Sequence, residues 1–179
     1  LKRVLGRMVD EKEFLSDYGI RSMSKIYEDE PFKFTVGGQN FTVKYTPAES
    51  DSRMFGGNSN WRGPIWFPIN FLIVESLQRF HYYYGESLQI EFPANSGEIR
   101  NLEFVSDNLS HRLCSIFRKN ENGDRPFNGG NDMLNYNEHF KDYIMFNEYF
   151  NGDTGMGIGA SHQTGWTATV AKLLKPHVS

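Results

Sequence analysis

The chain has 179 residues, a formal net charge of −3 and one cysteine, and these values exclude several classes of protein. This length fits about one domain. The small negative charge offers no basic surface to nucleic acid or to an anionic membrane, so we expect neither as a partner. A single cysteine can form no internal disulfide and no cysteine zinc site, and no apolar run reaches the roughly 18 residues of a membrane span.

The first residues already have helical spacing. Leu1, Val4, Leu5 and Met8 recur at i, i+3, i+4 and i+7. No Ser, Thr, Asp or Asn precedes them as an N-cap. We therefore expect that the chain starts inside a helix and is the C-terminal part of a longer protein.

Residues 32–45 predict a β-hairpin. Apolar and polar residues alternate in FKFTV and FTVKY, on the two sides of a GGQN turn. Residues 46–64 follow without any periodicity, and long ordered loops inside compact domains are usually functional.

The strongest helical pattern covers residues 65–84. Its first half is apolar nearly all round, which predicts burial on more than one side. Pro68 is tolerated only in a first turn, so the helix should start near Ile65 or Trp66, and Gly85 should close it at the C′ position. The predicted apolar face contains Ile69, Leu72, Ile73, Leu77, Phe80 and Tyr84.

Two further helices are predicted, from about Ile99 to Arg118 and from a Ser161 cap to about Leu174. The last helix should place Trp166 in the core, on one face with Val170 and Leu173. Residues 144–150 look extended. The expected fold class is all-α, with loops that build the site and with one small β-hairpin excursion.

Two stretches, GGNSNWRGPIWFPINFLIVESL and EYFNGDTGMGIGASHQTGWTATVAKLL, resemble the C-terminal catalytic half of glycoside hydrolase family 63. The resemblance is closest to bacterial members with a mannosylglycerate-hydrolase-like domain. Three further segments, YGIRSMS, YTPAESD and RPFNGGND, also resemble the bacterial pattern. It implies that residues 1–179 are the C-terminal portion of an (α/α)6 barrel, in which six inner helices are ringed by six outer ones. The implied partners are the remainder of this barrel and an oligosaccharide or small glycoside substrate.

Hydrolysis of a glycosidic bond needs two carboxyl groups. The resemblance implies an inverting, exo-acting α-glycosidase for an α-linked glucoside or mannoside, with Glu148 as general base and an aspartate acid upstream of this chain. From the residues alone, an alternative is a structural Glu148 whose head group binds loop amides. The turn-like contexts of four aspartates predict solvated turn residues at Asp17, Asp51, Asp132 and Asp153.

Trp61 and Arg62 are candidate sugar ligands, because the family's WRG segment lines its sugar site. Trp offers a flat surface to the C–H face of a pyranose, and Arg offers fixed donors to hydroxyls. Trp66 is a third candidate, with a core position as its alternative. Asn58 and Asn60 are expected to be turn formers.

Three more substrate-binding candidates are Arg21, His162 and Gln163. Arg21 resembles a site-facing family position, although a loop arginine is more often a solvated charge. His162 and Gln163 open the predicted last helix, where backbone donors point outward. A structural histidine is the alternative for His162.

Two other functions fit part of this pattern. A sugar epimerase would use His139 and His162 as acid and base, and a carbohydrate-binding or scaffold module would need no catalytic carboxylate. We expect no cofactor and no metal, because the histidines show no metal-ligand spacing. Glucosides, mannosylglycerate-like and glucosylglycerate-like substrates all stay open.

Two further expectations concern the behaviour of the isolated chain and the location of the protein in the cell. A barrel cut between helices exposes apolar faces, so the fragment is expected to self-associate and to be inactive. The single cysteine and the bacterial type of the resemblance favour a cytoplasmic location.

Overall fold

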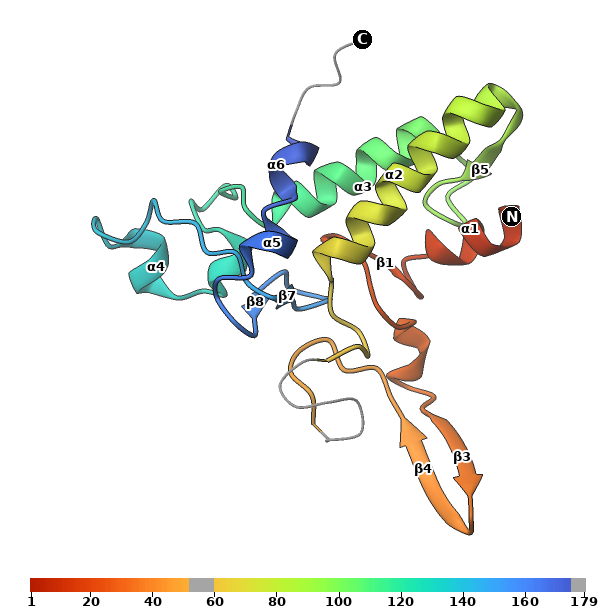
Figure 1. Cartoon of the computed structure of the whole chain (residues 1–179), viewed down its shortest axis with the longest axis horizontal. Coiled ribbons are helices and arrows are strands. Elements are labelled where there is room, and N and C mark those ends of the chain that lie inside the picture. Colours follow the sequence, from red (N-terminus) through yellow and green to blue (C-terminus); the bar gives the residue numbers. More distant parts are fainter. Residues whose placement is uncertain (52–59, 175–179) are drawn as a thin grey trace.

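The structure is a computed structural model that describes residues 1–51 and 60–174. Figure 1 shows how its elements are arranged. The α-helices are α1 (Lys2–Met8), α2 (Phe67–Tyr84), α3 (Leu102–Ser115), α4 (Asp132–Tyr136), α5 (Thr164–Thr167) and α6 (Val170–Leu173). The strands are β1 (Leu15–Ser16), β2 (Gly19–Ile20), β3 (Phe32–Val36), β4 (Gln39–Val43), β5 (Gln89–Glu91), β6 (Ile99–Asn101), β7 (Tyr149–Phe150) and β8 (Gly157–Ile158). Short 3-10 helices are η1 (Lys25–Tyr27), η3 (Gly85–Ser87) and η4 (Pro126–Asn128).

The fold is α+β, so the prediction of an all-α chain forming part of an (α/α)6 barrel was wrong. The strands of the described residues pair into four two-stranded antiparallel sheets, β1–β2, β3–β4, β5–β6 and β7–β8. Except in β3–β4, each strand has only two or three residues. Strands this short cannot show the alternation over four to eight residues by which a strand is recognised.

Helices α2 and α3 lie side by side at the centre of the molecule (Figure 1). The predicted limits of α2 are confirmed, since Trp66 is its N-cap, Pro68 lies in its first turn and Gly85 is its C-cap. Helix α3 begins later than predicted. The Asn101 side chain caps it by accepting a bond from the Phe104 amide (2.9 Å), and residues 99–101 form β6 instead.

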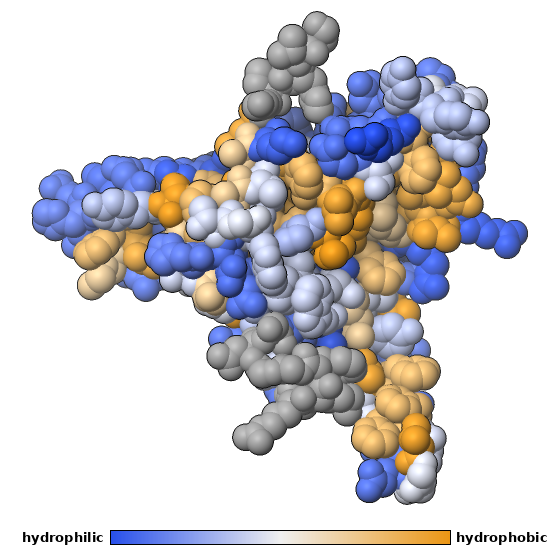
Figure 2. Space-filling view, in the orientation of Figure 1, coloured by the Kyte–Doolittle hydropathy of each residue, from blue (hydrophilic) through white to orange (hydrophobic). Residues whose placement is uncertain are grey.

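The buried face of α2 overlaps the predicted one only at Leu77. Its buried residues are Phe67, Asn70, Val74 and Leu77. Most of the predicted face is exposed, namely Ile69, Leu72, Phe80 and Tyr84. Figure 2 shows apolar surface around α2 and along β3–β4. A helix that is apolar nearly all round gives no periodic signal for the side that faces the core.

The predicted hairpin is confirmed as β3–β4, with Phe34 opposite Phe41. Gly37 and Gly38 form its two-residue turn with positive φ angles of 56° and 76°, as a type I′ turn requires. The Phe34 and Phe41 rings stack at 5.3 Å. The hairpin projects away from the helices (Figure 1).

The single helix predicted from Ser161 to Leu174 is instead divided into α5 and α6, and Gln163 is the N-cap residue of α5. The Thr167 hydroxyl donates to the Asn147 carbonyl and the Thr169 hydroxyl donates to the Trp166 carbonyl, both at 2.6 Å. The local Thr169 bond offers the Trp166 carbonyl an alternative to a helical partner, and the Thr167 bond ties α5 to the Asn147 segment.

Asn70 ties α2 to β2 through its side-chain amide. Its Oδ1 accepts a bond from the Ile20 amide (2.7 Å), and its Nδ2 donates to the carbonyls of Ile20 and Trp66 (3.0 Å each). We expect Asn70→Ala to lower the free energy of unfolding by about 2–4 kcal/mol, because it leaves buried backbone groups unpaired. Denaturant unfolding of the purified chain measures this. The control Ser76→Ala, on the exposed side of α2, should stay within about 0.5 kcal/mol, and an equal loss in both variants would contradict the assigned role.

Candidate active site

Three segments that are far apart in the sequence meet at Ile65. Its backbone forms antiparallel bridges with Arg21 and with Phe150. The Ile65 amide donates to the Phe150 carbonyl (2.8 Å), and the Phe150 amide donates to the Ile65 carbonyl (3.0 Å). The segment that carries Trp61 and Arg62 is therefore a direct neighbour of the segment that carries Glu148.

A stack of aromatic rings lies where these segments meet. The rings of Trp61 and Trp66 are nearly parallel, with centroids 3.9 Å apart, and Trp66 stacks on Tyr149 at 4.8 Å. Trp66 and Tyr149 are buried, whereas Trp61 is 45% exposed. The Trp66 indole also donates to the Asn60 carbonyl (2.9 Å). Trp61 is thus partly exposed, and one face of its ring rests on the buried Trp66.

Trp166 flanks this stack, at 5.8 Å from the Trp66 ring. It is 38% exposed, so its predicted place in the core was wrong. Because the last helix is broken before Val170, Trp166 no longer shares a helical face with Val170 and Leu173.

Glu148 is half-buried beside the stack and immediately before β7. Its amide donates to the Ala160 carbonyl (2.8 Å), and its Oε2 accepts a bond from the Ala160 amide (3.3 Å). A Cβ atom at Gly159, where φ is 73°, would come within 2.6 Å of Oε2. Only glycine therefore lets the following loop lie this close to the carboxylate.

Tyr149 was not predicted as a site residue. Burial, together with the negative charges of Glu49 and Glu148, raises the pKa of its phenol to about 12. The phenol therefore keeps its proton at neutral pH. Both carboxylates act on this one hydroxyl, which makes Glu49 a second acidic residue near the site. The YTPAESD motif was the sequence signal that contained it.

Arg62 is buried and braces the loop before it. Its Nη2 donates to Ser50 Oγ and to Asp51 Oδ1, both at 2.9 Å. Asp51 also pairs with Lys44 (2.7 Å), and the Lys44 and Arg62 contacts lower the pKa of its carboxyl. Asp51 is exposed, as expected of a solvated turn residue, and it also pairs with two cations. A direct contact between Arg62 and sugar stays a prediction.

Asn60 does more than form a turn. It is fully buried, and its Nδ2 donates to the carbonyls of Thr46 and Ala48 while its Oδ1 accepts from the Arg62 amide. These bonds fix residues 46–51 against the Trp61 segment. Asn58 lies outside the described residues.

Arg21 is buried in a charged cluster. Its Nε donates to the Tyr45 hydroxyl (3.1 Å), and its Nη2 contacts Asp153 Oδ1 (3.2 Å). Lys25 approaches the same oxygen at 3.0 Å. Asp153 was expected to be solvated, and this was wrong because it neutralises two cations. The role of Arg21 as a substrate ligand stays a prediction.

The remaining candidates are His162 and Gln163, which pair with the nearby Phe146 backbone, and two surface aspartates. His162 is exposed and its backbone forms a parallel bridge with Phe146, and the Gln163 amide donates to the Phe146 carbonyl (2.7 Å). Their contact with substrate stays a prediction. Asp17 and Asp132 are exposed, as expected.

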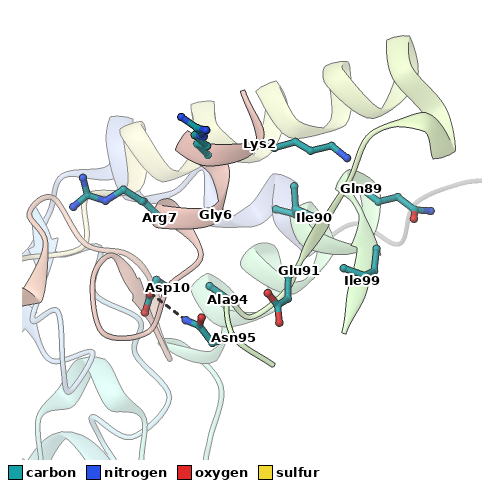
Figure 3. Close-up of a pocket in the computed structure, with 11 residues that line it drawn as sticks. Lys2, Gly6, Arg7, Asp10, Gln89, Ile90, Glu91, Ala94, Asn95 and Ile99 are labelled. Carbon is teal, nitrogen blue, oxygen red and sulfur yellow. Dashed lines mark hydrogen bonds between the residues drawn. The ribbon is translucent and has the colours of Figure 1, made fainter. Parts of the chain in front are cut away.

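Figure 3 shows a separate cavity of about 620 Å³ between α1 and the β5–β6 hairpin. Its charged lining includes Lys2, Arg7, Asp10 and Glu91, and none of the predicted site residues lines it. Within residues 1–51 and 60–174, no group of three His, Cys, Asp or Glu residues could hold a metal ion, and no helix is long and apolar enough to cross a membrane.

Comparison with protein families identifies the first two thirds of the chain. Residues 1–119 match the model of the glycosyl hydrolase family 63 C-terminal domain. The chain belongs to glycosyl hydrolase family 63. This confirms the resemblance to glycoside hydrolase family 63 noted in the sequence.

Known relatives of this family 63 chain occur in yeasts. Over 97% of its length the chain is 55% identical to Uncharacterized protein YMR196W of Saccharomyces cerevisiae. It is 26% identical to the mannosyl-oligosaccharide glucosidase of the same yeast and 24% identical to a probable mannosyl-oligosaccharide glucosidase of Schizosaccharomyces pombe, again over 97% of the chain. The chain spans only 15–16% of the length of these relatives.

The charged cluster around Asp153 should make stability sensitive to acid. Burial alone would raise the pKa of this carboxyl, but Lys25, Arg21 and Tyr45 hold it below its ordinary value of 3.8. A lowered pKa contributes stability that is complete above the ordinary value and is lost as pH falls through the folded value. We therefore expect Asp153→Asn to lose roughly 2 kcal/mol at pH 7. This loss should shrink below about pH 4, as measured by denaturant titration at a series of pH values. An equal loss at pH 3 and pH 7 would contradict this account.

Proposed function

We propose that this chain carries the general base of an inverting, exo-acting α-glycosidase that cleaves an α-linked glucoside or mannoside, with Glu148 as the base. The observation that carries the proposal is the bridge between Ile65 and Phe150, which brings the segment of Glu148 beside the stack of Trp61, Trp66 and Tyr149. Family membership supports hydrolysis of glycosides, and two relatives are named as mannosyl-oligosaccharide glucosidases.

The chemistry places separate demands on the carboxylate and on the rings. A general base must be ionised and must reach a water molecule, and the half-buried Glu148 is open to solvent on one side. A pyranose can stack its C–H face on the exposed ring of Trp61. An inverting enzyme also needs a carboxylic acid on the opposite face of the sugar. We assign that group to the protein upstream of this chain.

The exposed side of α2 is consistent with a chain that works within a larger protein. Its apolar residues on the surface include Ile69, Leu72, Phe80 and Tyr83. Exposed apolar patches of this kind usually mark contact surfaces. We propose that the remainder of the catalytic domain covers this side of α2, and that the isolated chain self-associates through it.

Two alternative functions predict different behaviour. A carbohydrate-binding or scaffold module would retain all its activity without the Glu148 carboxylate. An epimerase would depend on His139 and His162, which are both exposed and lie in different loops. Family membership favours the hydrolase over both.

Replacement of Glu148 tests the proposed base. In the full-length protein, Glu148→Gln should reduce turnover of an aryl-α-glycoside by about a hundred- to ten-thousandfold, because the amide cannot accept the proton of the attacking water. The variant should still bind the intact glycoside, as measured by calorimetry. NMR of the first-formed product anomer should show inversion in the wild type. Unchanged turnover by Glu148→Gln would favour the binding module.

The 179-residue chain by itself should not hydrolyse glycosides. The reason is that the proposed acid lies outside it, and loss of a general acid alone costs about a hundred- to ten-thousandfold in rate. The measurement compares the purified chain with the full-length protein on the same aryl-α-glycoside at equal molar concentration. Comparable rates would mean that a second catalytic carboxylate lies within residues 1–179.

A further inference from the structure

Glu49 lies on a loop that is fixed against the aromatic stack. Ala48 packs on the cluster that contains Trp66 and Tyr149, and its carbonyl accepts a bond from Asn60 Nδ2 (2.6 Å). On the other side of Glu49, the Ser50 hydroxyl accepts a bond from Arg62 Nη2. Glu49 is therefore held between two anchored neighbours, although its own side chain is exposed.

A further bond connects this loop to the segment that follows Glu148. The Gly152 amide donates to the Pro47 carbonyl (3.0 Å), so Pro47 lies beside a residue two positions beyond the end of β7. Glu49 and Glu148 thus approach the Tyr149 ring from two different loops. The negative charges of both carboxylates raise the pKa of the Tyr149 phenol, which agrees with this placement.

Two cations of this region that the structure describes, Lys44 and Arg62, share one acidic partner. Lys44 and Arg62 both pair with Asp51, at 2.7 and 2.9 Å. Glu49 is exposed, and the bond from Asn60 Nδ2 to the Ala48 carbonyl joins its neighbour in the chain to the residue that precedes Trp61. A carboxylate offers several acceptor sites to hydroxyl donors, and bonds to an ionised acceptor are stronger than neutral ones.

We propose that Glu49 is a second carboxylate of the sugar site, which accepts hydrogen bonds from the hydroxyls of a neutral sugar stacked on Trp61 and, together with Glu148, disfavours glycosides that carry a carboxylate. This inference rests on the proposed function of the site. It assigns to Glu49 a role in substrate binding and charge selection, distinct from the proton transfer assigned to Glu148. Among the substrates left open by the sequence, it selects neutral glycosides over glycerate-bearing ones.

The binding experiment uses full-length protein with Glu148→Gln, so that ligands are not hydrolysed. Calorimetry compares the methyl α-glycosides of glucose and mannose with glucosylglycerate and mannosylglycerate. Adding Glu49→Gln should weaken binding of the preferred methyl glycoside about tenfold, because a strong acceptor is lost. It should also shift the ratio of affinities about three- to tenfold toward the glycerate-bearing ligand, because one negative charge is removed.

Two further variants distinguish the effect of the negative charge at Glu49 from the effect of its hydrogen bonds to the sugar. Glu49→Asp keeps the charge and shortens the side chain, so it should weaken the neutral ligand but leave the selectivity ratio nearly unchanged. Glu121→Gln removes an exposed carboxylate elsewhere and should change neither value. If Glu49→Gln leaves both the affinity and the ratio unchanged while Glu148→Gln abolishes turnover, the inference about Glu49 is overturned and the proposed function stands.

A measurement that needs no ligand tests the placement itself. NMR of protein labelled at tyrosine Cζ, with Tyr149→Phe to assign the signal, reports the titration of the Tyr149 phenol. Glu49→Gln should lower its pKa, because a nearby negative charge is removed. An unchanged Tyr149 titration would overturn the inference whatever the enzyme activity. Turnover that persists in Glu148→Gln would instead overturn the proposed function.

Discussion

The backbone pairing of Ile65 with Phe150 determines how the rest of the site is arranged. In extended chains, successive side chains point to opposite sides. Ile65 and Phe150 therefore point into the main core, and their neighbours Trp66 and Tyr149 point together into a second, smaller cluster. The two hydrogen bonds between Ile65 and Phe150 thus fix the backbone so that core residues lie on one side of it and the residues of the ring stack on the other.

The ion pairs in the surrounding loops reduce the number of carboxyl groups that could act as the general acid. Arg21 and Arg62 are buried, and each is paired with an aspartate, Asp153 and Asp51 respectively. Removing one member of such a pair leaves an uncompensated buried charge, which is strongly destabilising. These two aspartates therefore have a structural task that conflicts with proton donation. This strengthens the assignment of the general acid to another part of the protein.

The sequence was a good guide where local chemistry decides the structure. Pro68 and Gly85 define the limits of α2, and the two glycines of the β3–β4 turn define the hairpin. It was a poor guide where distant contacts decide. Asn70 is buried because it bonds the backbone of Ile20, which lies 50 residues away, and this contact determines the side of α2 that faces the core. The pairing of Asp153 with Arg21 spans 132 residues and is equally invisible to a local pattern.

The close approach of neighbouring backbone explains why Glu148 lies among so many rings and glycines. Backbone approaches residues 148–150 at two points, since Ile65 bonds Phe150 and Ala160 bonds Glu148. Backbone can come this close only where side chains are absent: a Cβ atom at Gly152 would come within 2.4 Å of the Gly63 carbonyl oxygen. A larger residue at Gly159 would push the loop outward and remove the Ala160 amide from the carboxylate. The rings bury the segment, and the glycines let the backbone of Ala160 come close enough to bond Glu148, so that Glu148 is held in one position while it stays half-exposed.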